Sequence, residues 1–389
     1  MKDMRIAIIG AGISGLVAAH ALQRLGFRPR VYERVTELGE VGAGLTLAPN
    51  AMHALNSIGL AHQLEDLGLP PEHASVRHWE TGELKITLPR GSEMIEKFGA
   101  AYTHIHRADL HGALAGNVIA ADPDAIQLGA ELTALHDTGS GVDVNFAVGP
   151  GIHADVVIGA DGLRSTVRRA LFGAGKPRFT GYIAFRGLVP INHLPAGTIE
   201  PPSSCLSKGP DRSFARYLIR GGRALNFIGL AQRDGWSEEG WSIPASTEEV
   251  LAEYEGWHDE VQTIIRSVSA ENLFKWALFD REPLEEWTRG HVTLMGDAAH
   301  PMLPFLGSGA AMAIEDAVIL ARAFDSAASI DDALDRYFVA RHERTTHVML
   351  QSREAAKAYH SGRDEFSEGQ HVTAENLGIW AYNAADVPV

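Results

Sequence analysis

The 389-residue sequence predicts an α/β fold, α+β overall, in which a Rossmann-like domain with a parallel sheet is joined to a second domain built on a mainly antiparallel sheet. The chain opens with an apolar strand, a glycine-rich turn, a helix and a second strand, which is the order of a βαβ unit. Residues 181–278 then change to strand-like stretches, and an apolar strand with a long alanine-rich helix follows them. The parallel-sheet domain is therefore expected to be discontinuous in sequence.

Local patterning predicts each element in turn. Short apolar runs predict buried strands, and apolar–polar alternation predicts half-buried strands. Helices are expected where apolar residues recur at helical spacing and a glycine follows the last of them. The first half is expected to contain a strand at 5–9, a helix at 14–25, a strand at 29–33, a helix at 49–58, strands within 75–88, a helix at 108–114, a β-meander at 127–147 and a buried strand at 154–159. The second half is expected to contain strands at 182–189, 214–219 and 224–231, a helix near 247–268, a strand at 291–295 and a helix at about 309–323.

These elements predict the domain boundaries. The parallel-sheet domain is expected to comprise residues 1–74, 101–178 and 279–355, the second domain 75–100 and 179–278, and a helical or irregular tail 356–389.

Composition excludes several classes of protein. The net charge of −15 argues against nucleic acid as a partner, because phosphate binding needs clustered Lys and Arg. Cys205 is the only cysteine, which excludes an intramolecular disulfide and a multi-cysteine zinc site and favours a reducing, cytoplasmic compartment; no metal site is expected. The apolar run at 6–22 is interrupted by three glycines, so neither a membrane span nor a secretory signal is expected.

The glycine-rich turn at residues 10–15 has the G-x-G-x-x-G pattern. Gly10 permits the tight turn, Gly12 lets a pyrophosphate approach the backbone, and Gly15 lets the helix pack closely on the sheet. Glu33 ends the second strand, where its carboxylate can accept hydrogen bonds from a ribose diol. The pattern predicts a dinucleotide site, with a packing turn as the alternative, and does not separate FAD from NAD.

Two later motifs carry an aspartate at the mouth of a buried strand. Asp161 lies in residues 155–168 and Asp297 in residues 290–301. Either carboxylate could bind a polar part of a cofactor, and either could instead be a turn or N-cap residue.

With these three motifs in this order, the chain resembles the single-component flavoprotein aromatic hydroxylases, a family that includes salicylate hydroxylase, 3-hydroxybenzoate 6-hydroxylase and 6-hydroxynicotinate 3-monooxygenase. The resemblance covers almost the whole chain, and residues 101–110 and 312–317 are closest to the last two enzymes. It implies an FAD-binding domain, a substrate domain on the antiparallel sheet, and NADH or NADPH as a transient co-substrate. No second glycine-rich turn follows a strand, so a separate NAD(P)H domain is not expected.

The resemblance also implies which residues bind the cofactor. Glu33 and Arg34 should bind the adenosine ribose, Arg107 the flavin or pyrophosphate, and Asp297 the phosphate or ribityl region, while Asp161 should assist both FAD and NAD(P)H. The loop at 41–45 should cross one side of the flavin ring, and the helix that begins at 307–309 should point its N–H groups at the pyrimidine ring. The full expected set is Gly10, Gly12, Ser14, Gly15, Glu33, Arg34, Ala43, Gly44, Arg107, Leu132, Asp161, Asp297, Gly307, Ser308 and Gly309.

The catalytic candidates implied by the resemblance are Tyr217, His300 and Pro301. Tyr217 could instead be a packed strand tyrosine, His300 could serve the loop structurally, and His104 and His106 are expected to be structural. The expected substrate pocket comprises Thr46, Ser213, Tyr217, Leu303 and Phe305. Related enzymes carry His near the positions of Thr46 and Ser213 and often a polar residue at Phe305, so this pocket is expected to be more apolar.

A substrate carboxylate would need a cation or backbone donors. The candidate cations are Arg186, Arg212, Arg216 and Lys208. If residues 214–219 form a strand, Arg216 and Tyr217 face opposite sides and cannot line one pocket together.

The resemblance implies an FAD-dependent monooxygenase that uses NAD(P)H and O₂ to hydroxylate a small aromatic acid, phenol or hydroxypyridine through a flavin C4a-hydroperoxide, with decarboxylation left open. Two alternatives remain at this point: a flavin-dependent oxidase or reductase without oxygen insertion, and a non-catalytic FAD-binding protein. The expected assembly is a monomer or homodimer without membrane or nucleic-acid partners.

Overall fold

A six-stranded sheet is assembled from distant parts of the chain in the computed structural model, which describes all residues except 40–42, 174, 234, 236–242 and 360–372. The strand order is β18-β19-β11-β1-β2-β7. The strands are β1 (Ile6–Ile9), β2 (Arg30–Glu33), β7 (Ile126–Leu128), β11 (Val156–Gly159), β18 (Thr288–Arg289) and β19 (Val292–Leu294). All neighbouring pairs are parallel except β18–β19. The segments that follow β1, β11 and β19 therefore meet at one edge of the sheet.

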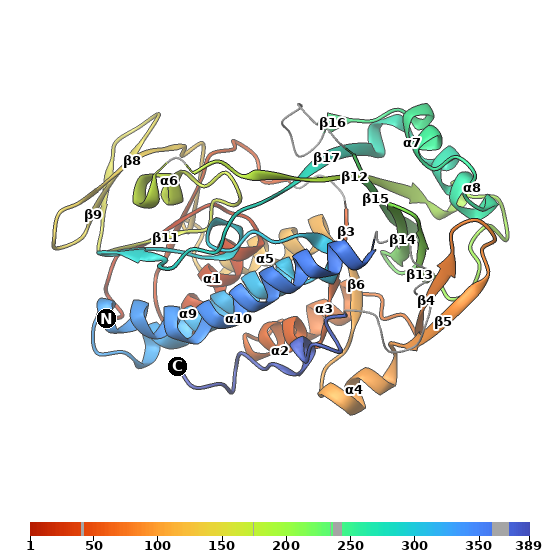
Figure 1. Cartoon of the computed structure of the whole chain (residues 1–389). Helices are drawn as coiled ribbons and strands as arrows, with labels where there is room; N and C mark the ends of the chain where they lie inside the picture. Colours follow the sequence, from red (N-terminus) through yellow and green to blue (C-terminus); the bar gives the residue numbers. More distant parts are fainter. Residues whose placement is uncertain (40–42, 174, 234, 236–242, 360–372) are drawn as a thin grey trace.

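Four long helices of the described chain belong to this part of the molecule. Helix α1 (Ile13–Arg24) contacts both α5 (Arg107–Ala121) and α9 (Gly309–Ser326), and α9 also contacts α10 (Ile330–Tyr359). Figure 1 shows α9 and α10 lying along each other. The shorter helices are α2 (Pro49–Ser57), α3 (Ala61–Leu67), α4 (Ser92–Phe98) and α6 (Thr166–Phe172). None of the described helices combines the length and apolar character that a membrane span requires.

The second large sheet has eight strands in the order β16-β17-β12-β15-β14-β13-β4-β5. Its pairs are antiparallel except for β13–β4. The strands are β4 (His73–His78), β5 (Leu84–Pro89), β12 (Arg178–Pro190), β13 (Ser204–Gly209), β14 (Arg212–Ile219), β15 (Ala224–Gln232), β16 (Ile243–Pro244) and β17 (Leu273–Asp280). The predicted fold class, a parallel sheet joined to a mainly antiparallel one, is confirmed.

The two faces of the eight-stranded sheet bury different partners. One face packs Phe185, Phe214 and Phe227 against helices α7 (Thr247–Glu253) and α8 (Asp259–Ser267). Figure 1 shows these helices at the opposite end of the molecule from both termini. The other face packs apolar side chains against the loop that precedes α9 and against the end of α10. This second cluster comprises Ala184, Leu230, Trp276, Leu278, Leu303, Phe305, Ala355 and Ala356.

Two sequence-based expectations about elements were wrong, and one long helix was not expected. The helix expected near 247–268 is two helices, because the chain turns between them at Gly256, whose φ is +78°. The expected meander at 127–147 is divided: β7 joins the parallel sheet, whereas β8 (Leu132–Asp137) and β9 (Val142–Phe146) form a separate sheet with β10 (Ile152–Ala154). Helix α10 was not expected and crosses the boundary drawn at residue 356. The domain boundaries themselves stay a prediction.

Candidate functional site

The glycine-rich turn joins β1 to α1 and leaves no room for side chains at two of its glycines. A Cβ atom on Gly10, whose φ is +107°, would lie 2.5 Å from the Ala160 carbonyl oxygen. A Cβ atom on Gly15 would lie 2.0 Å from the Gly10 carbonyl oxygen. A Cβ atom on Gly12 would meet nothing within 4 Å, so the backbone is open to a ligand there. The turn thus has the close packing and the exposed backbone that a phosphate site requires.

Two side chains face this turn. The Ser14 hydroxyl is buried and has no hydrogen-bond partner among the described residues. The Ala11 N–H donates to Glu33 Oε2 over 2.8 Å, which fixes the carboxylate at the end of β2 beside the turn. Arg34 follows it on the surface. An unpaired buried hydroxyl and a carboxylate at this place fit the phosphate and ribose of a dinucleotide.

We expect Gly15→Ala to lower the affinity for FAD by at least about 10-fold, because the added methyl group would push the α1 N-terminus away from the Gly10 carbonyl. The measurement is a titration of apoprotein with FAD, followed by flavin fluorescence. The matched control is Gly112→Ala in α5, where a Cβ atom would meet nothing within 4 Å. Equal FAD affinity in the two variants would contradict the role of the turn.

Asp161 follows β11 and binds the first turn of helix α6, whose N-cap residue is Ser165. Its carboxylate accepts hydrogen bonds from Ser165 Oγ at 2.5 Å and from the Thr166 and Val167 N–H groups at 2.6 and 3.1 Å. These bonds give Asp161 a local structural role beside the Ser165 cap, and its direct role in cofactor binding stays a prediction. From the same motif, Arg168 donates to the carbonyl oxygens of residues 298 and 299, so this segment supports the third motif.

Asp297 lies in the third motif, directly after β19. Its side chain keeps contact with solvent, yet the surrounding protein raises the pKa of its carboxyl group, and nearby His300 and Arg107 oppose that shift. The backbone N–H of Arg107 donates to the Ala43 carbonyl oxygen over 2.8 Å. The start of α5, the strand β3 (Gly44–Leu47) and Asp297 therefore lie around one region.

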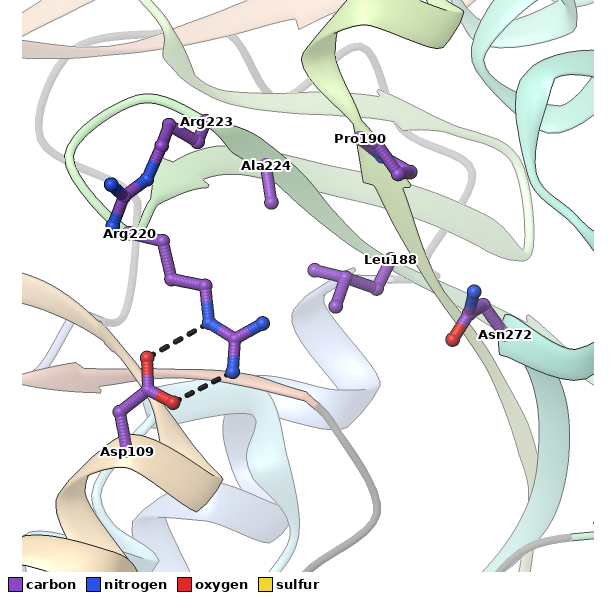
Figure 2. A pocket seen from close by; sticks show the side chains of 7 residues that line it. All are labelled: Asp109, Leu188, Pro190, Arg220, Arg223, Ala224 and Asn272. Atoms are coloured by element: carbon purple, nitrogen blue, oxygen red, sulfur yellow. Dashed lines mark hydrogen bonds and ion pairs between the residues drawn. The ribbon is translucent and has the colours of Figure 1, made fainter.

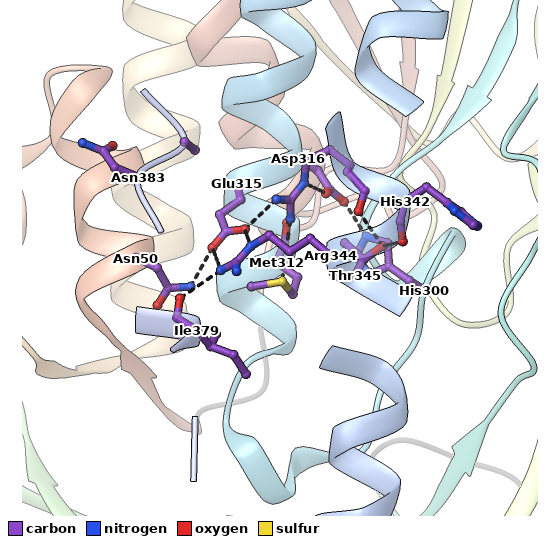
Figure 3. A network of polar contacts seen from close by, with 12 residues as sticks. Asn50, His300, Met312, Glu315, Asp316, His342, Arg344, Thr345, Ile379 and Asn383 are labelled. Atoms are coloured by element: carbon purple, nitrogen blue, oxygen red, sulfur yellow. Dashed lines mark hydrogen bonds and ion pairs between the residues drawn. The ribbon is translucent and has the colours of Figure 1, made fainter. Parts of the chain in front are cut away.

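A buried network of charges holds this motif in place (Figure 3). Asp316 accepts from the Gly296 N–H at 2.9 Å, lies 2.5 Å from His300 Nε2, and pairs with Arg341 at 2.7 Å. Burial alone would raise the pKa of Asp316, but His300 and Arg341 together lower it to about 2. The carboxylate is thus ionised and fixes both the start of the motif and its histidine.

Glu315 extends the same network. It pairs with Arg341 at 2.7 Å and with Arg344 at 2.8 Å, and it accepts from Asn50 Nδ2 at 2.7 Å. Glu315, Asp316 and Arg341 are fully buried. The network therefore connects helices α9, α10 and α2 next to the third motif. Asp316 orients His300 through Nε2, while the Nδ1 atom of His300 has no hydrogen-bond partner among the described residues.

The loop from Pro301 to the start of α9 supplies an apolar surface. Leu303 and Phe305 are buried against the eight-stranded sheet, and Phe305 lies edge-on to Tyr182 with ring centroids 5.3 Å apart. Gly307 has φ +60°, which permits the turn into the helix, and Ser308 precedes the first helical residue, Gly309. The N–H groups at a helix start lack intrahelical partners and favour an anionic or electron-rich ligand.

Tyr217 lies on β14 and faces the same side of the sheet as this loop. Its ring stacks on His104 of β6 (Thr103–His106), with centroids 4.1 Å apart and planes within 16°. His104 is fixed from both nitrogens: Nδ1 lies 3.0 Å from Thr46 Oγ1 and Nε2 lies 3.0 Å from Ser204 Oγ. Burial raises the pKa of Tyr217, an effect that the hydroxyl of Thr46 partly offsets, so the phenol is protonated at neutral pH.

The sequence did not point to Asn226, which connects strand β3 to strand β15 of the eight-stranded sheet. Its Oδ1 accepts from the Gly44 N–H at 2.6 Å, and a Cβ atom on Gly44 would lie 2.6 Å from the Tyr217 ring and 2.7 Å from the Asn226 side chain. Only glycine therefore lets β3 approach the sheet at this place. A buried asparagine on a strand with otherwise apolar buried neighbours was the available signal.

The residues that the sequence predicts for the substrate pocket differ in burial. Thr46 and Tyr217 are partly exposed, whereas Ser213, Leu303 and Phe305 are buried. Leu132 is buried at the start of β8. Residues 41 and 42 of the expected loop lie outside the described residues.

Two of the four arginine and lysine candidates for binding a substrate carboxylate are excluded by the structure. Arg216 pairs with buried Glu260 at 2.5 Å and Arg212 pairs with Glu253 at 2.7 Å, both on the α7–α8 side of the sheet. Arg216 and Tyr217 therefore do face opposite sides, as the strand pattern predicts. Arg186 lies on the Tyr217 side and over the Trp276 ring, 5.0 Å from its centroid.

We expect His104 to make stability depend on pH. Burial, assisted by nearby Arg90, lowers its pKa to about 3. The unfolded histidine has a pKa of about 6.5, so the unfolded chain binds more protons between these values and stability falls as the pH drops below about 6.5. At about pH 5 the loss relative to about pH 8 is about 2 kcal/mol.

Urea unfolding at fixed FAD concentration tests this expectation. His104→Asn should remove that part of the pH dependence, while His62→Asn, at a fully exposed side chain, should keep all of it. Identical pH dependence in both variants would refute a buried, neutral His104.

Comparison with known proteins relates this geometry to a family. A family model described as FAD binding domain matches residues 3–352. A 3-amino-4-hydroxybenzoate 2-monooxygenase of Streptomyces platensis is 38% identical, covering 99% of this chain and 97% of that protein. A 6-hydroxynicotinate 3-monooxygenase of Pseudomonas fluorescens is 37% identical, covering 82% of each. The crystal structure of Klebsiella pneumoniae HpxO with FAD and uric acid has a TM-score of 0.87 and 26% identity, covering 100% of this chain and 98% of that chain.

Proposed function

The chain belongs to the FAD-binding family of flavoprotein aromatic monooxygenases, and from this premise we propose that Tyr217 positions a single-ring aromatic substrate that carries an ionisable hydroxyl group. Its cofactor is FAD, and NADH or NADPH is the transient co-substrate. When bound, FAD would transfer the electrons of NAD(P)H to O₂ and so activate the oxygen for the reaction. The protein's own residues then have to hold the ring, control its proton and exclude water.

The stacked pair of Tyr217 and His104 carries the proposal. Because its pKa is raised, Tyr217 keeps its proton at neutral pH and can donate a hydrogen bond. A donated bond favours the ionised form of a substrate hydroxyl, and ionisation makes the ring more electron-rich. Tyr217 thus acts in the proposal as a hydrogen-bond donor to a phenolate and not as a tyrosinate base.

Thr46 and His104 position Tyr217 in this proposal. His104 is neutral above a pH of about 3, so its contact with Thr46 and its stack on Tyr217 do not change across the physiological range. Both residues therefore act on the substrate through the position of the Tyr217 hydroxyl. His300 is proposed as a positioning residue as well, because its Nε2 is committed to Asp316.

Apolar surroundings are suited to the oxygen chemistry. Leu303 and Phe305 on the loop oppose Leu230 and Trp276 on the sheet. A dry, apolar surface between these elements would protect a reactive oxygen species from water. Thr46 and Ser213, where related enzymes carry histidine, leave this surface with fewer ionisable groups than theirs.

The proposed substrates are small aromatic acids, phenols and hydroxypyridines. The two relatives named above act, by their names, on rings that carry both a hydroxyl and a carboxylate group. Arg186 is the proposed cation for such a carboxylate, since it lies on the Tyr217 side of the sheet. We further propose a cytoplasmic enzyme, because Cys205 is buried and has no second cysteine to pair with. Its proposed assembly is a monomer or a homodimer.

A substrate screen tests this proposal. The holoenzyme is supplied with NADH or NADPH and with 3-hydroxybenzoate, 3-amino-4-hydroxybenzoate or 6-hydroxynicotinate, and products are identified by mass spectrometry. We expect at least one hydroxylated ring to stimulate NAD(P)H oxidation and to gain an oxygen atom. Peroxide formation with every ring, without oxygenated product, would overturn the proposal in favour of an oxidase.

A further inference from the structure

A cavity of about 480 Å³ lies between the eight-stranded sheet and the start of α5. Its Leu188 is paired across the sheet with Asn226, which is paired in turn with Tyr217. Leu188 and Pro190 at the end of β12 and Ala224 at the start of β15 form its apolar side. Figure 2 shows Leu188 and Pro190 across the cavity from the turn that joins β14 to β15, and Ala224 beside that turn. An apolar wall of this size can accept a flat ring or part of a larger ligand.

The other side of the cavity is polar and mostly basic. Arg220 makes a bidentate pair with Asp109 of α5, with N–O distances of 2.7 and 2.8 Å, which fixes its guanidinium (Figure 2). Arg223 is exposed, and no carboxylate of the described residues lies within ion-pair distance of it. Asn272 adds an amide at the rim. The cavity therefore presents one anchored and one available guanidinium.

The turn between β14 and β15 has a backbone that brings both arginines to this cavity. Arg220, Gly221 and Gly222 have φ values of +55°, +63° and +82°, all in the left-handed region. A non-glycine residue held there costs about 1–3 kcal/mol and persists only when its surroundings fix it. At Arg220 the pair with Asp109 does so. Such positions cluster at ligand-binding sites.

The cavity is adjacent to the cofactor region. Asp109 lies two residues after Arg107, whose N–H binds the Ala43 carbonyl and whose charge acts on Asp297. A ligand in the cavity could thus extend along the start of α5 towards the flavin. The sequence contains no second G-x-G-x-x-G pattern as an alternative for a dinucleotide.

We propose that this cavity binds the adenosine–pyrophosphate portion of NADH or NADPH while the nicotinamide reaches the flavin. The inference rests on the proposed function, which requires NAD(P)H. Arg223 and Arg220 match the pyrophosphate, and Leu188, Pro190 and Ala224 match the adenine ring. The lining carries two guanidinium groups against the one carboxylate of Asp109, which leaves a net positive charge for an anionic co-substrate in a chain with a net charge of −15.

Rapid-reaction kinetics of the FAD-loaded enzyme test the inference. Anaerobic flavin reduction is measured against NAD(P)H concentration for wild type, Arg223→Glu, Arg223→Lys and the control Arg266→Glu, which changes an exposed arginine on α8. We expect Arg223→Glu to raise the apparent Kd for NAD(P)H at least about 10-fold, with an unchanged limiting rate. Arg223→Lys should weaken NAD(P)H binding less than Arg223→Glu does, because the positive charge remains although the planar guanidinium is lost.

Direct binding supplies the second readout. Calorimetric titration of the oxidised enzyme with ADP-ribose should show the same loss in Arg223→Glu, whereas the Kd of the aromatic substrate should not change. An unchanged NAD(P)H affinity in Arg223→Glu would overturn the inference, as would weakened binding of the aromatic ring in its place. If wild type oxygenates no aromatic compound but Arg223→Glu still weakens ADP-ribose binding, the proposed function fails and the dinucleotide site stands.

Discussion

Tyr217→Phe is expected to lower kcat/KM for hydroxylation by about 10²-fold while FAD stays bound. The reason is that the variant keeps the stack on His104 but loses the hydroxyl that would donate to the substrate oxygen. The ring of the substrate would then ionise less, so oxygen transfer should slow and peroxide should escape. The measurement is the ratio of hydroxylated product to NAD(P)H consumed, together with kcat/KM for the aromatic substrate.

Two controls separate this role from packing. Flavin reduction at saturating NAD(P)H should be unchanged in Tyr217→Phe, and the pH profile should shift towards the pKa of the free substrate hydroxyl. Tyr182→Phe removes a hydroxyl from the same sheet face, beside Phe305, and should leave the product ratio near that of wild type. Full coupling in Tyr217→Phe would contradict the proposed role of the phenol.

Arg341→Leu is expected to lower the free energy of unfolding by about 3–5 kcal/mol. The change leaves the carboxylates of Glu315 and Asp316 fully buried without the guanidinium that pairs with both. Urea unfolding at fixed FAD concentration measures the loss. Because Asp316 also binds His300 and the Gly296 N–H, the variant should release FAD more readily as well.

A surface ion pair on the same helix provides the control. Arg336 pairs with Asp332 on α10, where both side chains are about one-third exposed or more. Arg336→Leu should cost less than about 1 kcal/mol, since exposed pairs contribute little. Equal stability of the two variants would show that the buried network does not support the third motif.

The parallel sheet could be predicted because its signals are local. Gly10 and Gly15 are required by contacts within the turn and with the neighbouring strand, so their spacing is visible in the sequence. The pairing of β1 with β11, and of β11 with β19, follows from apolar runs that lead into glycine-containing motifs. Family resemblance supplied the identity of the nucleotide, which spacing alone left open.

Long-range polar contacts could not be predicted in the same way. The bond from Gly44 to Asn226 joins residues 182 positions apart, and no local pattern marks it. Helix α10 carries a fully buried Arg341 whose ion-pair partners lie on α9. The charged residues of α10 therefore do not lie on one exposed face, and the helix lacks the apolar–polar pattern that would predict it. His104 was expected to be structural, and its stack on Tyr217 connects it to the proposed substrate site.

Isotope labelling is the most direct test of the claim that this protein is an aromatic monooxygenase. The holoenzyme is supplied with NAD(P)H, ¹⁸O₂ and the ring that best stimulates NAD(P)H oxidation, and the product is analysed by mass spectrometry. We predict that the new hydroxyl group carries ¹⁸O from O₂, with product formed in proportion to NAD(P)H consumed. Recovery of the unchanged ring with all consumed O₂ as peroxide, or a hydroxyl group labelled from water, would contradict the claim.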